Sequence, residues 1–291
     1  MSWLQLKCST QPQYVDELSE WLSAHGALSV TYEDAADQPL YEPPPGETPL
    51  WQHTVVTGLF EANTDIDAIT ATLQQAVTTL EQLRVEILED KDWVREWMTR
   101  YQPMQFGPAL WIVPSHHTPP DPQAINILLD PGLAFGTGTH PTTAMCLRWL
   151  AAHPPQDQLV VDYGCGSGIL AIAAAKLGAR QVIAVDNDPQ ALLATTRNAE
   201  HNGVADVIEC RGVEPPLQAQ CDTLLANILA GPLISLAPQF AEFVRPGGNI
   251  VLSGILAEQA ETVKHAYETW FDFQAPQQQD EWVLMNATRQ S

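Results

Sequence analysis

The 291-residue sequence predicts an α/β protein of two domains, a small α+β domain followed by a larger one with a mainly parallel, twisted sheet. Three observations support this prediction. Short alternating apolar runs flank two helical stripes up to about residue 90, and near-continuous apolar runs alternate with longer helices from about residue 124. A glycine-rich loop joins the first of those later runs to a helix. The length also suits about two domains.

The first block, residues 1–90, has the element order of a ferredoxin-like domain. Its order is strand, helix, strand, strand, helix, strand. An acidic, proline-rich loop around residues 43–46 separates the second strand from the third. Alternation predicts strands at 4–8, 28–32, 55–59 and 85–87, and helical spacing predicts helices at 15–22, ended by Gly26, and at 66–80.

Residues 91–123 are predicted to connect the two blocks. Trp93, Trp97 and Tyr101 lie four positions apart, which predicts a helix over 91–107 whose aromatic side chains serve packing. The proline-rich residues 118–122 predict a stiff, extended segment.

Residues 124–291 alternate strands with helices. Near-continuous apolar strands between helices are typical of a parallel sheet that is covered on both faces. Strands are predicted at 159–161, 182–185, 223–226 and 250–252, and helices at 169–179, 190–202, 233–244 and 258–270.

The composition excludes some classes of partner. The formal net charge is −22, which disfavours binding to nucleic acid or anionic lipid and favours a basic partner or simply an acidic, soluble protein. The five cysteines are an odd number in a long chain, so we expect reduced thiols in a cytoplasmic protein, and the lack of a C-x-x-C pair argues against a zinc site or a thioredoxin-like motif. The amino terminus lacks the features of a signal peptide, and the most apolar stretch, 169–175, is too short to span a bilayer.

The strongest chemical signal is the loop from Asp162 to Gly168, which reads D-Y-G-C-G-S-G between a strand and a helix. Its glycines, Gly164, Gly166 and Gly168, allow a sharp turn and the close approach of a ligand. The N–H groups at the start of the helix favour an anionic group. The spacing departs from the dinucleotide fingerprint, the P-loop and the nucleophile elbow.

Asp186 ends the next predicted strand, 24 residues after Asp162. A carboxylate at this place can accept hydrogen bonds from both hydroxyls of a ribose. The alternative is structural, with the glycines making a tight turn and Asp186 capping the helix before Pro189. The glycine loop and Asp186 follow two consecutive strands at matching positions. Together they favour a ligand that contains a ribose.

At these residues the sequence resembles the class I, Rossmann-like methyltransferases, which bind S-adenosylmethionine. The segments 130–143 and 227–230 (N-I-L-A) further resemble the ribosomal protein L11 methyltransferase (PrmA) family, and the first block resembles its substrate-recognition domain. The resemblance implies cofactor contacts from Thr143, Gly164, Asp186 and Asn227, within a binding loop that includes Asp162, Gly166 and Gly168. It also implies methylation of the α-amino group and lysine side chains of a basic large-subunit ribosomal protein.

Asn227 is the candidate catalytic residue. We expect its amide oxygen to accept a hydrogen bond from the substrate amine; the alternative is that it only caps a turn. For Thr143, the alternative to a cofactor contact is that it is only a residue in the first turn of a helix, near the cap. Residues 136–138 are predicted to fold over the cofactor. His140 could act as a base, but a histidine before proline in a loop is more often structural or solvated. Cys165 is expected to be small packing, and the pair His116–His117 lacks partners for a metal site.

Other functions remain open at this point. The chain could methylate another protein or a small molecule, or it could bind the cofactor without catalysis. The Asn227 motif argues against a non-catalytic module, the separate first domain against a small-molecule enzyme, and the net charge against an RNA methylase. We expect a cytoplasmic monomer without a metal and without a nucleic-acid or membrane partner.

Overall fold

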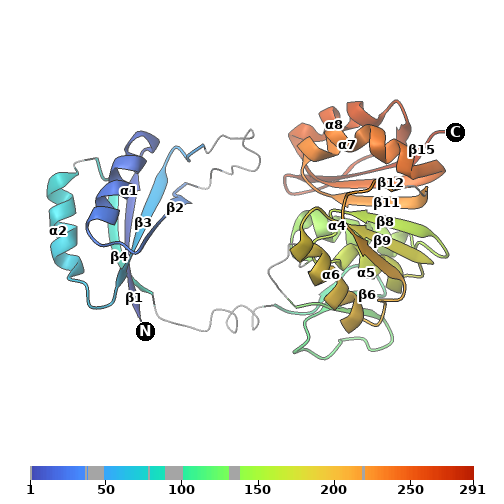
Figure 1. The fold of residues 1–291 in the computed structure, drawn as a ribbon, viewed down its shortest axis with the longest axis horizontal. Helices are drawn as coiled ribbons and strands as arrows, with labels where there is room; N and C mark the ends of the chain where they lie inside the picture. Colours follow the sequence, from blue (N-terminus) through green and yellow to red (C-terminus); the bar gives the residue numbers. More distant parts are fainter. Residues whose placement is uncertain are drawn as a thin grey trace. The chain divides into compact units, whose positions relative to one another are not determined.

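The structure is a computed structural model that describes residues 2–36, 38, 49–77, 79–88, 101–130, 138–217 and 220–291. The chain divides into two compact units, Met1–Trp93 and Val94–Ser291, and each is described by itself (Figure 1). The predicted loop at 43–46, most of the predicted helix over 91–107 and residues 136–137 of the predicted lid lie outside the described residues.

The first unit is a four-stranded antiparallel sheet with two helices. The strand order is β2-β3-β1-β4, and every neighbouring pair is antiparallel, which confirms the ferredoxin-like prediction. The elements are β1 (Trp3–Thr10), α1 (Val15–Ala24), β2 (Ser29–Asp34), β3 (Thr54–Glu61), α2 (Ile66–Ala76) and β4 (Gln82–Leu88).

Both helices of this unit cover the same face of the sheet. Leu6 and Phe60 from the strands pack with Leu22 of α1 and Leu73 of α2 in one buried cluster. Helix α2 ends before the predicted residue 80, because Val77 adopts an extended conformation with φ −119° and ψ 106°.

The second unit contains a mixed sheet of mainly parallel strands. Its order is β10-β9-β8-β11-β12-β15-β13, with β14 also paired to β15. The first five strands in this order are parallel, and β15 lies antiparallel to its neighbours. The strands are β8 (Leu159–Tyr163), β9 (Gln181–Val185), β10 (Ile208–Arg211), β11 (Cys221–Asn227), β12 (Val244–Leu256), β13 (Phe271–Phe273), β14 (Gln277–Gln279) and β15 (Trp282–Arg289).

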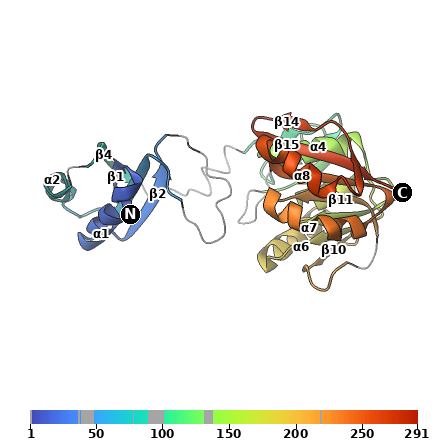
Figure 2. The same cartoon turned by 90° about the horizontal axis from the view of Figure 1, so that it is seen from above.

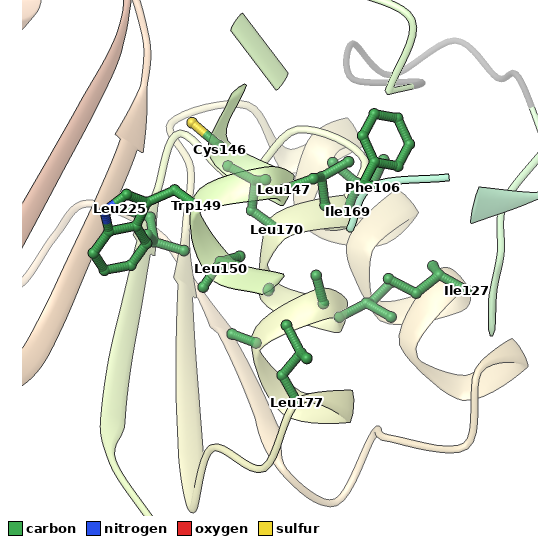
Figure 3. Packing of buried hydrophobic residues seen from close by; sticks show 14 of the residues in the cluster. Phe106, Ile127, Cys146, Leu147, Trp149, Leu150, Ile169, Leu170, Leu177 and Leu225 are labelled. Carbon is green, nitrogen blue, oxygen red and sulfur yellow. The ribbon is translucent and has the colours of Figure 1, made fainter. Parts of the chain in front are cut away.

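Helices cover both faces of this sheet, as the apolar strands predicted (Figure 2). Neighbouring residues in a strand point to opposite faces, so Val160 packs toward one helix layer and Val161 toward the other. One layer consists of α4 (Pro141–Ala152), α5 (Ile169–Lys176) and α6 (Pro189–His201), and the other of α7 (Ala230–Phe243) and α8 (Ala260–Tyr267). Figure 3 shows side chains of α4 and α5 gathered with Leu225 of β11.

A small three-stranded sheet replaces part of the predicted connecting segment. It is formed by β5 (Met104–Gln105), β6 (Leu110–Val113) and β7 (Ile125–Leu128). The predicted helix does not continue through 104–107, because Met104 and Gln105 pair with Ile112 and Trp111. Ile127 of β7 joins the core beneath α4 and α5, so this segment belongs to the second unit (Figure 3).

Candidate active site

The glycine loop turns sharply between β8 and α5. Gly164, Gly166 and Gly168 all have positive φ, at 80°, 55° and 79°. The backbone N–H groups of Gly164 and Cys165 donate to the carbonyl of Val185, at 2.8 and 3.0 Å. The loop is therefore tied to the end of the neighbouring strand β9, which is where Asp186 begins the next segment.

Two of the glycines are required by the packing of the protein itself. A Cβ on Gly164 would lie 2.3 Å from Cγ2 of Ile228, and a Cβ on Gly168 would lie 2.7 Å from Cγ2 of Thr195. Gly168 is buried, whereas Gly164 and Gly166 are partly exposed. The sequence predicted room for a ligand here; the structure adds a packing role that depends on residues far along the chain.

Asp186 holds the glycine loop and keeps capacity to bind further donors. Its Oδ2 accepts the Gly166 N–H at 3.0 Å, and its Oδ1 accepts the Asp188 N–H at 3.0 Å. Asp188, and not Asp186, caps α6 by accepting the Gln190 N–H at 2.8 Å. The capping alternative for Asp186 is therefore wrong. Each carboxylate oxygen has about two lone pairs, so each can accept one more hydrogen bond.

Asp162 lies beneath the loop. Its side chain is buried, and its Oδ2 accepts the backbone N–H of Ala171 in α5 at 2.9 Å. Burial raises the pKa of Asp162 to about 7, and the negative charge of Asp186 also raises it, whereas the bond from Ala171 lowers it. The carboxyl thus joins the end of β8 to the helix that follows the loop.

Asn227 and Thr143 meet at the end of β11. Nδ2 of Asn227 donates to Oγ1 of Thr143 at 3.2 Å. Asn227 is half-buried and Thr143 is 1% exposed in the first turn of α4. The turn-cap alternative for Asn227 does not describe this side chain, whose bond reaches another element. Two candidates that lie far apart in the sequence are thereby brought into direct contact.

His140 is the N-cap of α4 and contacts Thr142, the residue before Thr143. Its Nδ1 lies 2.7 Å from Oγ1 of Thr142 and accepts the Thr142 N–H at 3.4 Å. Its ring also packs edge-on against Trp282, with centroids 4.9 Å apart. Burial lowers the pKa of His140, which favours the neutral ring that this cap requires. The structure therefore gives His140 a structural role.

Ile228 connects the glycine loop to Asn227. It fills the space beside Gly164, and its carbonyl oxygen would lie 2.4 Å from a Cβ on Gly254, which has φ +83°. The segment after Asn227 is thus fitted between the loop and β12. From the sequence, Ile228 was identified only as part of the segment 227–230 and Gly254 not at all; the signal for Gly254 was a glycine two positions after the apolar run 250–252.

Two other features that the sequence raised, the pair His116–His117 and the thiol of Cys165, provide no metal site and no reactive group in the structure. The rings of His116 and His117 contact each other with centroids 4.4 Å apart, and no group of three or more His, Cys, Asp or Glu side chains in the described parts of the chain could hold a metal ion. Burial raises the pKa of Cys165, so its sulfur remains a thiol. Across the described ranges, no helix is long and apolar enough to cross a membrane.

The site fits a nucleoside ligand. The carboxyl ends of β8, β9 and β11 meet at one edge of the sheet, where α/β proteins bind ligands. There the partly exposed Gly164 and Gly166 lie beside a carboxylate that can still accept two hydrogen bonds. Asn227 adds a polar amide at the end of β11, linked to the same loop through Ile228.

Comparisons with known proteins agree with this architecture. The sequence model of the family described as ribosomal protein L11 methyltransferase (PrmA) matches residues 2–290. A protein of that name from Marinobacter nauticus is 52% identical over 99% of both chains, and one from Shewanella halifaxensis is 51% identical over 99% of this chain and 100% of its own.

A solved structure gives the same answer for the fold. The crystal structure of a ribosomal protein L11 methylase from Lactobacillus delbrueckii subsp. bulgaricus superposes with a TM-score of 0.60 and 32% identity, over 66% of this chain and 100% of that one. The fold is that of the class I methyltransferases, and the cofactor of this family is S-adenosylmethionine. The chain belongs to the ribosomal protein L11 methyltransferase (PrmA) family.

Proposed function

We propose that this protein transfers methyl groups from S-adenosylmethionine to amines of ribosomal protein L11, namely its N-terminal α-amino group and lysine ε-amino groups. The observation that carries the proposal is the Asn227–Thr143 hydrogen bond at the end of β11, beside the glycine loop. The names of the related proteins support L11 as the substrate.

The accessible residues are proposed to bind the cofactor. The backbone of Gly164 and Gly166 faces the ligand, and the two remaining lone pairs of Asp186 accept the ribose hydroxyls. The buried residues Asp162, Gly168 and Thr143 hold these groups in place and do not reach the ligand directly. Gly164, Gly166 and Asp186 are therefore proposed to contact the cofactor, and Asp162, Gly168 and Thr143 to position the residues that do.

The bound cofactor supplies a methyl group on a positively charged sulfur, so the protein needs no strong acid or nucleophile. The chain orients the amine, which must arrive neutral because an ammonium has no lone pair. One N–H of Asn227 Nδ2 donates to Thr143 and fixes the orientation of the amide, and the amide oxygen Oδ1 then accepts an N–H of the amine. Such orientation is worth about 7–11 kcal/mol in well-placed reactants. A terminal amine, with a pKa of about 7.7–8.0, loses its proton more readily than a lysine at about 10.4.

The acidic character of the chain suits a basic partner. A net charge of −22 attracts a positively charged ribosomal protein and raises the rate of encounter. We expect kcat/KM for L11 to fall as the salt concentration rises, because salt screens this attraction. A value of kcat/KM that does not change with salt would mean that the net charge serves only the solubility of the protein. We propose a cytoplasmic monomer that binds neither nucleic acid nor membrane.

The direct test uses labelled S-adenosylmethionine and L11 purified from cells that lack this enzyme. Mass analysis of the product is expected to find methyl groups on the α-amino group and on lysines. Label on another ribosomal protein, or on a small molecule, would show that L11 is not the substrate. Cofactor binding without any labelled acceptor in a whole ribosomal-protein fraction would favour a non-catalytic binding module.

A further inference from the structure

A β-bulge in β12 lies next to Asn227. In the pairing with β15, Leu252 lies opposite Met285, but Ile255 lies opposite Val283. Two residues, Ser253 and Gly254, therefore face the single residue Leu284. Gly254 has a φ of +83°, a conformation that an extra residue in a strand often needs. The bulge shifts the alternation of side chains after Gly254, so that Ile255 packs on the α7 and α8 side of the sheet, while Ser253 keeps the α4 side that its place after Leu252 gives it.

Ser253 connects three elements. In the parallel ladder it lies directly beside Asn227 of β11. Its side chain is fully buried, and its Oγ donates to the carbonyl oxygen of Thr142 in the first turn of α4 at 3.3 Å. The same hydroxyl lies beside the thiol of Cys146, one turn further along α4. The hydroxyl thus joins the bulge to the turn that carries Thr143.

The Asn227–Thr143 bond depends on where that turn lies. At 3.2 Å it is at the long end of the usual range for an N–H···O bond, so a shift of a few tenths of an ångström weakens it. At the amino end of α4, the His140 cap holds the first turn of the helix through Thr142. From the sheet, the contact that holds the same residue is the Ser253 hydroxyl.

We propose that Ser253 is a positioning residue for methyl transfer: its hydroxyl, which lies at the bulge, holds the first turn of α4 where Thr143 orients the amide of Asn227. This inference rests on the proposed function, because it takes Asn227 as the residue that receives the amine. It assigns Ser253 no contact with substrate or cofactor. It predicts that Ser253 acts only through Thr143.

The test is a double-mutant cycle of Ser253→Ala and Thr143→Val, measured with S-adenosylmethionine and L11. Ser253→Ala is expected to lower kcat by about tenfold, with little change in KM for the cofactor, because the loss is one of orientation. In the Thr143→Val background the same change should have little further effect, because residues that act as a unit are not additive. Ser253→Cys keeps a side chain of similar size but has a weaker hydrogen-bond donor. Its kcat is expected to lie between the values of the wild type and of Ser253→Ala.

A matched control lies at the other end of β11. Thr223 is also buried and donates to Oε1 of Gln158 at 2.9 Å, so Thr223→Val removes a buried hydroxyl from the same sheet. It should lower stability without changing kcat. If Ser253→Ala behaves like this control, or if the two kcat losses multiply fully in the double variant, the proposal is overturned.

A second readout separates this proposal from the substrate assignment. The side-chain NH₂ resonances of Asn227, identified by their loss in Asn227→Ala, are expected to shift in Ser253→Ala toward their positions in Thr143→Val. Unchanged resonances would overturn the role of Ser253 even if L11 is methylated normally. Shifted resonances in a protein that methylates no L11 would support the role of Ser253 and reject the proposed substrate.

Discussion

The side-chain amide of Asn227 donates a hydrogen bond to the hydroxyl of Thr143 across 84 positions of the chain. This contact joins the end of β11 to the first turn of α4. It also uses one N–H of the amide to fix its orientation, and the oxygen is the group of the amide that can accept a hydrogen bond from a substrate amine. Other contacts of the site position these two residues. Ile228 packs against Gly164 of the glycine loop next to Asn227, and Ser253 at the bulge in β12 bonds to Thr142 next to Thr143.

The first prediction concerns the hydroxyl of Thr143. Thr143→Val keeps the size of the side chain but removes the acceptor for Asn227 Nδ2. We expect kcat to fall by about 10- to 100-fold, because small errors of orientation have effects of this size. Steady-state kinetics with saturating cofactor measure it. Thr143→Ser retains the hydroxyl and should stay near the wild-type rate; equal losses in both variants would contradict the account.

The second prediction concerns the packing of Gly164 on Ile228. Gly164→Ala places a Cβ 2.3 Å from Ile228 Cγ2 at a φ of +80°. Strain and overpacking together should lower the free energy of unfolding by about 2–4 kcal/mol and disturb cofactor binding. Gly203→Ala is the matched control, because Gly203 has a φ of +67° with no atom within 4 Å of an added Cβ. It should cost only about 1 kcal/mol and leave binding unchanged. Similar denaturant curves for the two variants would be the contrary result.

The third prediction concerns the acidic residue after β9. Asp186→Ala removes both oxygens proposed to hold the ribose and should weaken cofactor binding by about 100-fold, from the loss of charge-assisted hydrogen bonds. Calorimetric titration with S-adenosylmethionine measures the affinity. Asp188→Ala removes the cap of α6 instead. It should cost about 1 kcal/mol of stability without changing affinity. If Asp188→Ala weakened cofactor binding and Asp186→Ala did not, Asp186 would not be the residue that binds the ribose.

The fourth prediction follows from the buried carboxyl of Asp162. Its pKa in the folded protein is about 7, above the ordinary value of 3.8. The native state therefore binds more protons than the unfolded state between these values. The stabilisation from protonated Asp162 is complete below about pH 4 and is lost as the pH rises through 7, by at most about 1.4 kcal/mol per pH unit.

Asp162→Asn removes this titration while keeping an oxygen for the Ala171 N–H. We expect the wild type to lose stability relative to this variant between pH 4 and pH 7 and the difference to level off above that range. Urea unfolding at several pH values measures the difference, and the carboxylates shared by both proteins largely cancel. A difference that stays constant over this range would show that Asp162 keeps an ordinary pKa.

Local patterns were sufficient to predict much of the fold. The loop from Asp162 to Gly168 stands between an apolar strand and an apolar helix, so β8, α5 and β9 could be placed from the sequence alone. The short strands β5 to β7 were missed, because two to four residues carry too little periodicity to be distinguished from a loop. Helix α7 begins at Ala230, earlier than predicted, because Pro232 is tolerated in a first turn.

The site could be predicted only in part. Gly166 and Asp186 were named from spacing, and the hydrogen bond between them follows from two adjacent parallel strands. The contacts of Ile228 with Gly164 and Gly254, and of Thr143 with Asn227, could not be predicted. They depend on how elements distant in the sequence pack together, and no local pattern records that packing.

The central claim is that Asn227 receives the amine. The measurement that tests it most directly is the turnover of Asn227→Ala with labelled S-adenosylmethionine and L11, alongside thermal unfolding of the same protein. Asn202→Ala is the control, because the side chain of Asn202 bonds to Leu128 and Asn198 and should affect stability rather than transfer. We predict that Asn227→Ala folds normally and transfers no detectable methyl group. Near-normal transfer by this variant would contradict the account.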